Sequence, residues 1–303
     1  MENNTNYHIP VLFNECIEGL AINPDGIYVD VTFGGGGHSR GIFEKLSAKG
    51  RLISFDQDPD AIKNTWQAPN FQFQAANFSF ISNHLRLLGI KKVDGILADL
   101  GVSSHQFDTE QRGFSIRGNA PLDMRMNQNG KVSAMTIVST YEENELIRIF
   151  KTYGEVPNAR KVASELVKAR GIKKIRTTEQ LMEALKYCAP KFKEHKYFAQ
   201  IFQALRIEVN NELDVLEQLL LQSSELLNEG GRFVVMSYHS LEDRLVKNYF
   251  KRGSLDGTIT KDFFGNVLKP FEEITRHPVV PSEEETERNT RARSAKLRIA
   301  VKK

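Results

Sequence analysis

The sequence predicts an α/β protein built on a mostly parallel sheet, with an all-helical part inserted into the chain. Over the first hundred residues, short apolar runs alternate with helical stretches. Helical patterns fill most of the next hundred, and strand-like runs return only after residue 230. Strands that are apolar along nearly their whole length and alternate with helices are typical of a parallel sheet covered on both faces.

Six strands are expected, four of them before the helical part. The predicted strands are 26–33 (GIYVDVTF), 50–58 (GRLISFDQD), 71–76 (FQFQAA), 93–101 (VDGILADLG), 230–240 (GGRFVVMSYHS) and 295–302 (AKLRIAVK). Helices are predicted between the first four strands, at 38–50, 60–67 and 79–89, because apolar residues recur there at helical spacing. The sheet therefore begins in the first third of the chain and is completed in the last.

The middle of the chain reads as a helical insertion. Helices are expected at 140–154, 158–171, 177–190 and 197–228, the first with a capping box of Thr140 and Glu143. The last is expected to be helical throughout, with room for a bend, and to end at Gly230 and Gly231. The polar segment 281–294 is predicted to be a loop or an arm. The predicted domain organisation is 1–105 and 205–303 for the sheet domain, with 106–204 as the insertion.

Charge and composition narrow the class of protein. No run of about 18 apolar residues occurs, and the start MENNTNYHIP lacks the basic and apolar stretches of a secretion signal, so a cytoplasmic protein is expected. The two cysteines and seven histidines have no metal-ligand spacing, and no metal is predicted. Residues 148–196 hold 13 Lys and Arg against 5 Asp and Glu, which indicates either a phosphate-bearing partner or a solvated helical surface.

Four glycines, Gly34 to Gly37, follow the first predicted strand, where a bare backbone usually approaches a ligand closely. A phosphate-binding loop would need a lysine here, and there is none. A dinucleotide fingerprint needs glycines at offsets 0, 2 and 5, but the last offset falls on Ser39 or Arg40. The fingerprint fits poorly, but a dinucleotide stays open, and the third candidate ligand is S-adenosylmethionine, whose methionine part carries no phosphate.

Acidic residues end two neighbouring strands. Asp56, at the end of the second strand, can accept the ribose hydroxyls of either nucleoside ligand. Asp99, at the end of the fourth, favours a cationic sulfonium ligand and would repel a pyrophosphate. Each could instead be an ordinary strand-end cap, and His38 could be a helix N-terminal residue with local hydrogen bonds. Their joint placement at one sheet edge favours a ligand site.

Nine blocks carry a resemblance to a known family. They are DVTFGGGGHS, FDQDP, DGILADLGVSSHQFD, RGFS, PLDMRM, YGE, FQALRIEVNNEL, SYHSLEDR and RARSAKLRIA, in this order from residue 30 to residue 300, and the resemblance itself begins at HIPVLFNE, residue 8. In these blocks the chain resembles the bacterial 16S rRNA (cytosine-N4) methyltransferases, the MraW or RsmH family. It departs from the family pattern at EHKYFAQI and VPNARKVA, both in or beside the insertion.

The resemblance implies a class I S-adenosylmethionine-dependent methyltransferase fold with a helical insertion. It implies that the methyl donor contacts Gly36, Gly37 and His38 in the turn, Asp56 at the ribose, Phe78 at the adenine, Asp99 at the methionine end, and Gln106, which closes the pocket. The implied reaction is methylation of the N4 amine of cytidine 1402 in the decoding region of 16S rRNA, within the 30S subunit. The protein could be a monomer or a homodimer.

The catalytic group is not predicted. The Pro-Pro-aromatic turn that many amino-methyltransferases place after the fourth strand is replaced here by LGVSS, residues 100–104. Ser103, Ser104, Asp99 and His239 are the nearest polar side chains, and each could instead be a supporting residue.

Contacts to RNA phosphates are expected from the basic insertion and from Arg288, Arg291, Arg293, Lys296 and Arg298. Two other functions are compatible with parts of the pattern. An NAD-dependent oxidoreductase fits the sheet, the glycines and Asp56, whereas an RNA-binding scaffold without catalysis fits the basic insertion.

Overall fold

The computed structural model describes residues 10–303, which divide into two compact units. The sheet unit comprises the described residues up to Gly101 together with Asp214–Lys303, and the helical unit comprises Val102–Leu213. The domain boundaries predicted from the sequence lie after residues 105 and 204 and stay a prediction, while the compact units divide after residues 101 and 213.

The sheet unit contains seven strands in the order β3-β2-β1-β4-β5-β7-β6. Their bounds are β1 Ile27–Asp30, β2 Arg51–Asp56, β3 Phe71–Ala75, β4 Val93–Asp99, β5 Leu227–Ser237, β6 Phe271–Glu273 and β7 Lys296–Lys302. The first five strands are parallel to one another, and β7 runs antiparallel between β5 and β6. The predicted α/β fold with a mostly parallel sheet is confirmed, and β6 is a strand that the sequence analysis did not predict.

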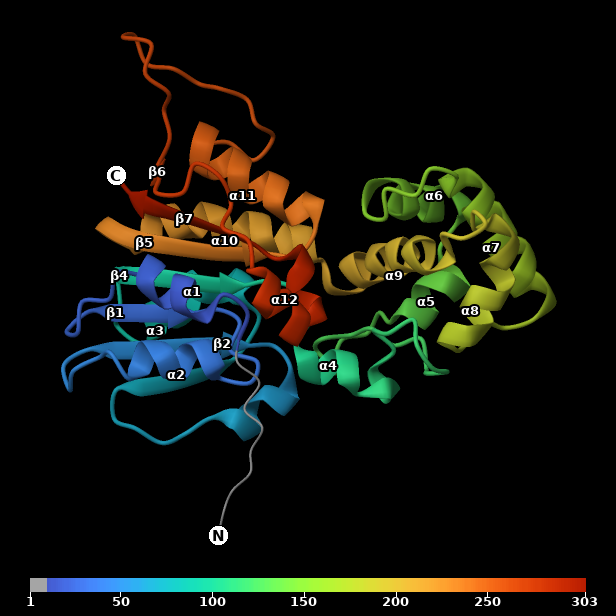
Figure 1. Ribbon diagram of the computed structural model, residues 1–303, viewed down its shortest axis with the longest axis horizontal. Coiled ribbons are helices and arrows are strands. Elements are labelled where there is room, and N and C mark those ends of the chain that lie inside the picture. Colours follow the sequence, from blue (N-terminus) through green and yellow to red (C-terminus); the bar gives the residue numbers. More distant parts are fainter. Residues whose placement is uncertain (1–9) are drawn as a thin grey trace. The chain divides into compact units, whose positions relative to one another are not determined.

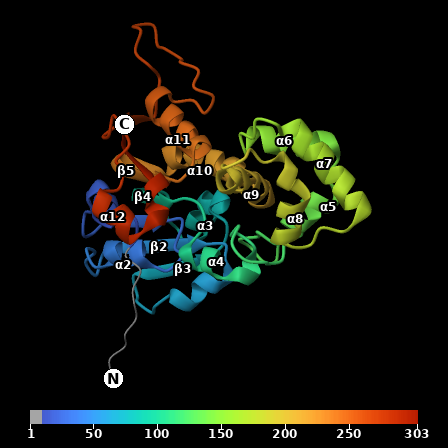
Figure 2. The ribbon, with the colours of Figure 1, turned by 45° about the vertical axis from the view of Figure 1, so that its right-hand side comes forward.

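Helices cover both faces of this sheet (Figures 1 and 2). Their bounds are α1 Phe13–Gly19, α2 Gly37–Phe43, η1 Pro59–Asn64, η2 Phe78–Phe80, α3 Ile81–Leu87, α10 Glu212–Leu226, α11 Ser240–Arg252, α12 Glu283–Arg288 and η5 Thr290–Ser294, where η denotes a 3₁₀ helix. One core packs α1, α2 and η5 on the sheet, and the other packs α3, α10 and α11. Successive residues of β2, such as Leu52 and Ile53, enter opposite cores, so the strands are apolar on both faces.

The helical unit has a separate hydrophobic core. Its elements are α4 Ser104–Asp108, η3 Glu110–Arg112, α5 Ala134–Thr140, α6 Glu143–Thr152, α7 Ala159–Ile172, α8 Thr178–Leu185, η4 Lys186–Cys188 and α9 Glu194–Asn210. The stretch 197–228, expected to be helical with room for a bend, forms two helices, α9 and α10, and is not helical to its end. Asn211 has φ +50° and separates α9 from α10, because a left-handed residue ends a helix. The helix ends at Leu226, ahead of Gly230 and Gly231.

Two local expectations also need correction. The segment predicted as a loop at 281–294 contains α12 and η5. Helix α12 is anchored by the backbone N–H of Leu12, which donates to Glu285 Oε1 at 2.8 Å. The segment predicted as a helix at 60–67 is the short 3₁₀ helix η1. Among residues 10–303, no helix combines the length and the apolar character that crossing a bilayer requires.

Candidate functional site

The glycine turn follows β1 and leads directly into α2. Gly34 and Gly36 have positive φ values of +51° and +78°, and the N–H of Gly36 donates to the Phe33 carbonyl at 2.7 Å. A Cβ on Gly36 would lie 2.9 Å from the Phe33 ring, whereas a Cβ on Gly35 would meet no atom within 4 Å. The turn therefore needs glycine at position 36 for its own geometry. At position 35 the backbone is bare toward open space, as the approach of a ligand requires.

Asp56 at the end of β2 supports this turn. Its Oδ2 accepts the N–H of Gly34 at 2.7 Å, and its Oδ1 accepts the N–H of Asp58 at 2.8 Å. Burial raises the pKa of Asp56 to about 6, against the lowering effect of these two hydrogen bonds. Asn64 holds the other side of the turn, because its Nδ2 donates to the Gly34 carbonyl at 2.9 Å. The sequence analysis missed Asn64, which lies at the end of a 3₁₀ helix with no motif.

Asp99 at the end of β4 has two side-chain neighbours. The hydroxyl of Tyr238 donates to Asp99 Oδ1 at 2.9 Å, and His38 Nδ1 lies 3.6 Å from Asp99 Oδ2. Burial raises the pKa of Asp99 to about 7, and the Tyr238 hydrogen bond acts against that rise. Tyr238 follows β5, which pairs with β4, and the sequence analysis did not single it out. The strand-end block SYHS contains it, and its position after an apolar strand was the available signal.

His38 is a neutral imidazole at physiological pH. Its side chain is buried and stacks on Phe13, with ring centroids 6.0 Å apart and planes at 14°. Burial lowers the pKa of His38 to about 4. Its Nε2 is buried and has no hydrogen-bond partner among residues 10–303. The imidazole therefore adds no positive charge beside Asp99, and this sheet edge is acidic overall.

A buried polar network lies beneath the turn. Asp30 Oδ2 accepts the Ser39 hydroxyl at 2.6 Å, and Ser39 Oγ lies 2.7 Å from Ser54 Oγ. Thr32 joins the network to the next strand, because its N–H donates to Asp30 Oδ1 at 3.0 Å and its Oγ1 accepts the N–H of Asp99 at 2.7 Å. The network connects β1, α2, β2 and β4 through side chains, so it holds the turn and Asp99 in one arrangement.

The predicted cofactor residues of the sheet unit lie along one edge, at the carboxyl ends of adjacent parallel strands. Phe78 follows β3, Asp56 ends β2, Gly36, Gly37 and His38 follow β1, and Asp99 ends β4. Ligands of open α/β sheets bind at this edge. The side chain of Asn77 links two of these ends, because its Nδ2 donates to Gln57 Oε1 at 2.8 Å. The order adenine, ribose and methionine end, as the resemblance implied it, matches the order of the strands.

Gln106 lies in the helical unit. It is buried and forms a capping box at the start of α4, in which its Oε1 accepts the Ser103 N–H at 3.0 Å and its own N–H donates to Ser103 Oγ at 3.2 Å. Its predicted contact with the methyl donor stays a prediction. His239, another predicted candidate, caps α11, where Glu242 is its capping-box partner.

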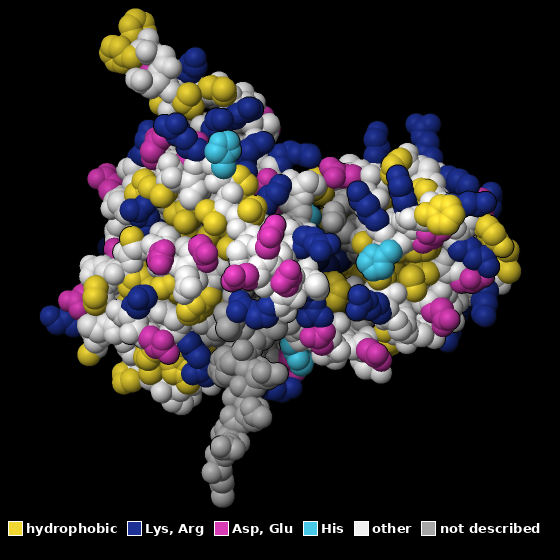
Figure 3. All heavy atoms as spheres, in the orientation of Figure 1, with side chains coloured by type: hydrophobic (Ala, Val, Ile, Leu, Met, Phe, Trp, Pro, Cys, Tyr) yellow, Lys and Arg dark blue, Asp and Glu magenta, His cyan; other side chains and the backbone are white. Residues whose placement is uncertain are grey.

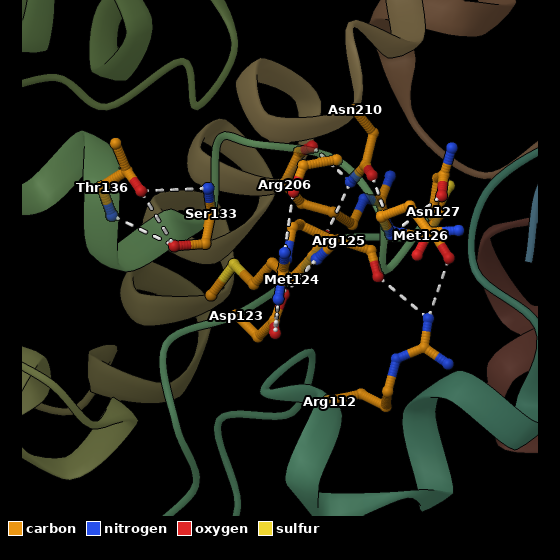
Figure 4. A network of polar contacts seen from close by, with 12 residues as sticks. Arg112, Asp123, Met124, Arg125, Met126, Asn127, Ser133, Thr136, Arg206 and Asn210 are labelled. Atoms are coloured by element: carbon orange, nitrogen blue, oxygen red, sulfur yellow. Dashed lines mark hydrogen bonds and ion pairs between the residues drawn. The ribbon is translucent and has the colours of Figure 1, made fainter.

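Three of the sequence blocks meet inside the helical unit (Figure 4). Asn210 Oδ1 accepts the Met126 N–H and its Nδ2 donates to the Met124 carbonyl, both at 2.8 Å. Arg112 Nη2 donates to the carbonyls of Arg125 and Met126 at 2.9 and 3.0 Å. The loop PLDMRM is therefore held by RGFS on one side and by the end of α9 on the other. Met124 has φ +59°, a strained value for a residue with a side chain.

Two predicted phosphate contacts have partners within the protein. Arg298 is buried in β7, and its Nε donates to Asp243 Oδ1 at 2.7 Å, so its predicted role as a phosphate contact is wrong. Lys296 Nζ lies 3.3 Å from Asp243 Oδ2. The side chains of Arg288, Arg291 and Arg293 are exposed, so a phosphate contact stays a prediction for these three residues.

A cavity of about 590 Å³ lies between α1, α2 and α12. It is lined by Phe13, Arg40, Glu285 and Arg288, among others, and Gly37 is the one predicted cofactor residue in its wall. Its lining includes neither Asp56 nor Asp99.

Comparison with known proteins decides the family. The sequence model of the MraW methylase family matches residues 5–303. The chain belongs to the MraW methylase family. It is 52% identical to a protein of Bacteroides fragilis, 55% to one of Cytophaga hutchinsonii and 54% to one of Flavobacterium johnsoniae, each over 97% or more of this chain and 98% or more of the relative. All three are named ribosomal RNA small subunit methyltransferase H.

Family membership makes the protein a methyltransferase with the class I fold and S-adenosylmethionine as its methyl donor. It removes the oxidoreductase and the non-catalytic scaffold as alternatives. The residues at the sheet edge fit this ligand: a bare backbone at Gly35 faces open space, and a carboxylate with a neutral histidine beside it suits a cation.

Proposed function

We propose that the protein transfers a methyl group from S-adenosylmethionine to the exocyclic N4 amine of cytidine 1402 of 16S rRNA, within the small ribosomal subunit. The family and the names of the relatives support this proposal. The geometric observation that carries it is Asp99, an acid held at the end of β4 beside the glycine turn, where its side-chain neighbours Tyr238 and His38 are both neutral. The proposal includes a cytoplasmic location, where ribosomal subunits are assembled.

The sheet edge provides a binding surface for a cation. When bound, S-adenosylmethionine supplies a reactive methyl group on a positively charged sulfur. The Asp99 carboxylate attracts such a ligand, and Tyr238 holds the carboxylate in position through its hydroxyl. Because the pKa of Asp99 is about 7, a cation beside it favours the ionised form and lowers that pKa.

The remaining residues place the two ends of the donor. Asp56 at the end of β2 accepts the ribose hydroxyls of the donor. Its hydrogen bond from the Gly34 N–H keeps the glycine turn in place beside the ribose. Phe78 lies partly exposed after β3 and packs against the adenine. Gln106 closes the pocket, and Gly36, Gly37 and His38 line the methionine end. Fixing the donor at these points orients the methyl group before the amine arrives.

The experiment is methyl transfer from labelled S-adenosylmethionine to small-subunit rRNA, either free or in 30S particles, followed by identification of the product nucleoside and its position. The expected product is N4-methylcytidine at position 1402. A different methylated nucleoside, or label at another position, would overturn the assigned target while leaving the methyltransferase itself in place. Asp99→Asn is the matched control, since it should lose transfer to both substrates.

A further inference from the structure

An arm of the sheet unit, residues 254–270, projects between α11 and β6 (the orange loop at the top of Figure 1). The two sides of the arm are joined by an isolated antiparallel bridge between Lys261 and Val267. The Leu268 N–H donates to the Thr260 carbonyl at 2.8 Å, and the Asp262 N–H donates to the Asn266 carbonyl at 2.9 Å. Leu255 at the base of the arm packs against the core of the sheet unit, and the proposed cofactor site does not include the arm.

The tip of the arm is an ordered turn that presents two phenylalanines to solvent. Asp262 Oδ1 accepts the backbone N–H of Phe264 at 2.8 Å and that of Asn266 at 2.9 Å, and Gly265 has φ +86°. Phe263 is 98% exposed and Phe264 is 85% exposed. Their rings stand 5.7 Å apart at 87°, so they offer two perpendicular aromatic surfaces. An exposed aromatic pair on a hydrogen-bonded turn is costly in water unless a partner covers it.

The end of α11 that leads into the arm is basic, whereas the arm 254–270 itself holds two lysines and two aspartates. Residues 247–269 contain five Lys and Arg against two Asp. Lys247, Lys251 and Lys261 are exposed, whereas Asp256 and Asp262 accept hydrogen bonds within their own turns. Figure 3 shows the apolar side chains at the tip of the arm and dark blue basic side chains toward its base. Exposed aromatics beside unpaired positive charge are the composition that binds single-stranded nucleic acid.

We propose that the arm 254–270 contacts unpaired bases of the RNA substrate, with Phe263 and Phe264 stacking on bases and Lys247, Lys251 and Lys261 binding the adjoining phosphates. The inference rests on the proposed function for the identity of the RNA. The occupant is RNA and not a second copy of the chain, because the tip offers two rings, far less apolar area than a stable dimer of roughly 1,200–2,000 Å² requires.

The first test is photo-crosslinking of the full-length protein. p-Benzoylphenylalanine replaces Phe263, the protein is mixed with 30S particles, and the crosslinked partner is identified after irradiation. A crosslink to 16S rRNA that maps to an unpaired nucleotide is the expected result. A crosslink confined to ribosomal proteins, to a second copy of the chain, or to nothing would overturn the assignment to RNA.

The second test separates ring stacking from general apolar contact. The double variant Phe263→Ala/Phe264→Ala should raise the KM for the RNA substrate about 100-fold, roughly tenfold for each of the two lost stacking contacts, with kcat and the Kd for S-adenosylmethionine unchanged. Phe263→Tyr/Phe264→Tyr should restore the wild-type KM, and Phe263→Leu/Phe264→Leu should not. Restoration by leucine, or an unchanged KM in the alanine variant, would contradict the proposal.

A matched control and a separate readout keep this inference distinct from the proposed function. Leu87→Ala removes an 83% exposed apolar side chain of α3, away from the arm, and should leave the KM for RNA unchanged. Crosslinking is scored without methyl transfer. A protein that crosslinks to 16S rRNA but methylates another position refutes the target and keeps the arm, whereas methylation of cytidine 1402 with no crosslink refutes the arm alone.

Discussion

In the sheet unit the acidic side chains at the strand ends are buried or half-buried and hydrogen-bonded, whereas in the helical unit the basic side chains stand in solvent. Asp30 is 1% exposed, and Asp99 shares its surroundings with Tyr238 and His38. Of the 13 Lys and Arg in residues 148–196, every one but Arg170 is exposed. A few desolvated charges can recognise a small cation with little dependence on salt, while many exposed charges bind a polyanion with strong dependence on salt. The two units are therefore suited to two different ligands.

The largest expected effect is at Asp99. Asp99→Asn should weaken S-adenosylmethionine binding by about 100-fold, because it removes the charge that the cation faces while keeping the size of the side chain. Calorimetric titration of the donor measures the loss, and far-UV circular dichroism checks the fold. RNA binding should not change, since the basic residues are elsewhere. Unchanged donor affinity would show that the acidic edge has another purpose.

The next contrast lies within the glycine turn. Gly35→Ala should leave the thermal stability of the protein intact, because its Cβ meets no atom within 4 Å, yet weaken donor binding tenfold or more by occupying the ligand's space. Gly36→Ala should cost about 1 kcal/mol or more of stability, because φ is +78° and the Phe33 ring is 2.9 Å away. Thermal melts with and without donor separate the two effects. A Gly35→Ala protein that binds the donor normally would mean that the backbone does not lie against it.

Donor binding should also depend on pH. The cation requires ionised Asp99, whose pKa is about 7 in the empty site, so affinity should fall as the pH drops below 7. The stability of the protein without donor should change in the opposite direction. The pKa values of Asp99 and Asp56 are raised in the folded protein, so the folded state binds more protons than the unfolded one, and the free energy of unfolding should decline from pH 4 toward pH 7. The increase in melting temperature on adding donor should therefore grow between pH 5 and pH 8.

The variant Tyr238→Phe sharpens that test. Loss of the hydroxyl removes the hydrogen bond that lowers the pKa of Asp99, so the pH midpoint of donor binding should move upward. Leu87→Ala, on the far end of α3, should leave the midpoint in place and serves as the control. A midpoint that moves down in Tyr238→Phe would show that the hydroxyl does not stabilise the carboxylate.

The smallest effect concerns the helical unit. Lys173→Gln/Lys174→Gln removes two exposed charges after α7 and should lower the slope of log Kd for RNA against log salt by about one to two. Donor affinity should stay the same. Lys45→Gln/Lys49→Gln removes two exposed lysines of the sheet unit outside the arm and should leave the slope unchanged. Equal slopes in all three proteins would contradict a phosphate contact at these helices.

Much of the sheet edge could be predicted from local pattern. Apolar runs that stop at Gly34, Asp56 and Asp99 predict strands that end there, and parallel strands bring those ends to one edge. Helix α12 was missed because SEEETER has no apolar periodicity, although Ser282 followed by Glu285 is a capping signature, and the Glu285 N–H does donate to Ser282 Oγ at 3.2 Å. The break at Asn211 was missed because asparagine in the left-handed region leaves no pattern in hydropathy.

The amino-acid sequence by itself determined the α/β class, the family, the glycine turn and the two strand-end acids, because each follows from patterns of residues that are close together in the chain. Only the tertiary structure decided what those acids contact. Tyr238 and Asp99 are 139 residues apart in the chain, and Asp30, Ser39 and Ser54 meet across two strands and a helix. Such pairs follow from strand order and burial, which set the pKa values and hydrogen bonds that no local pattern carries.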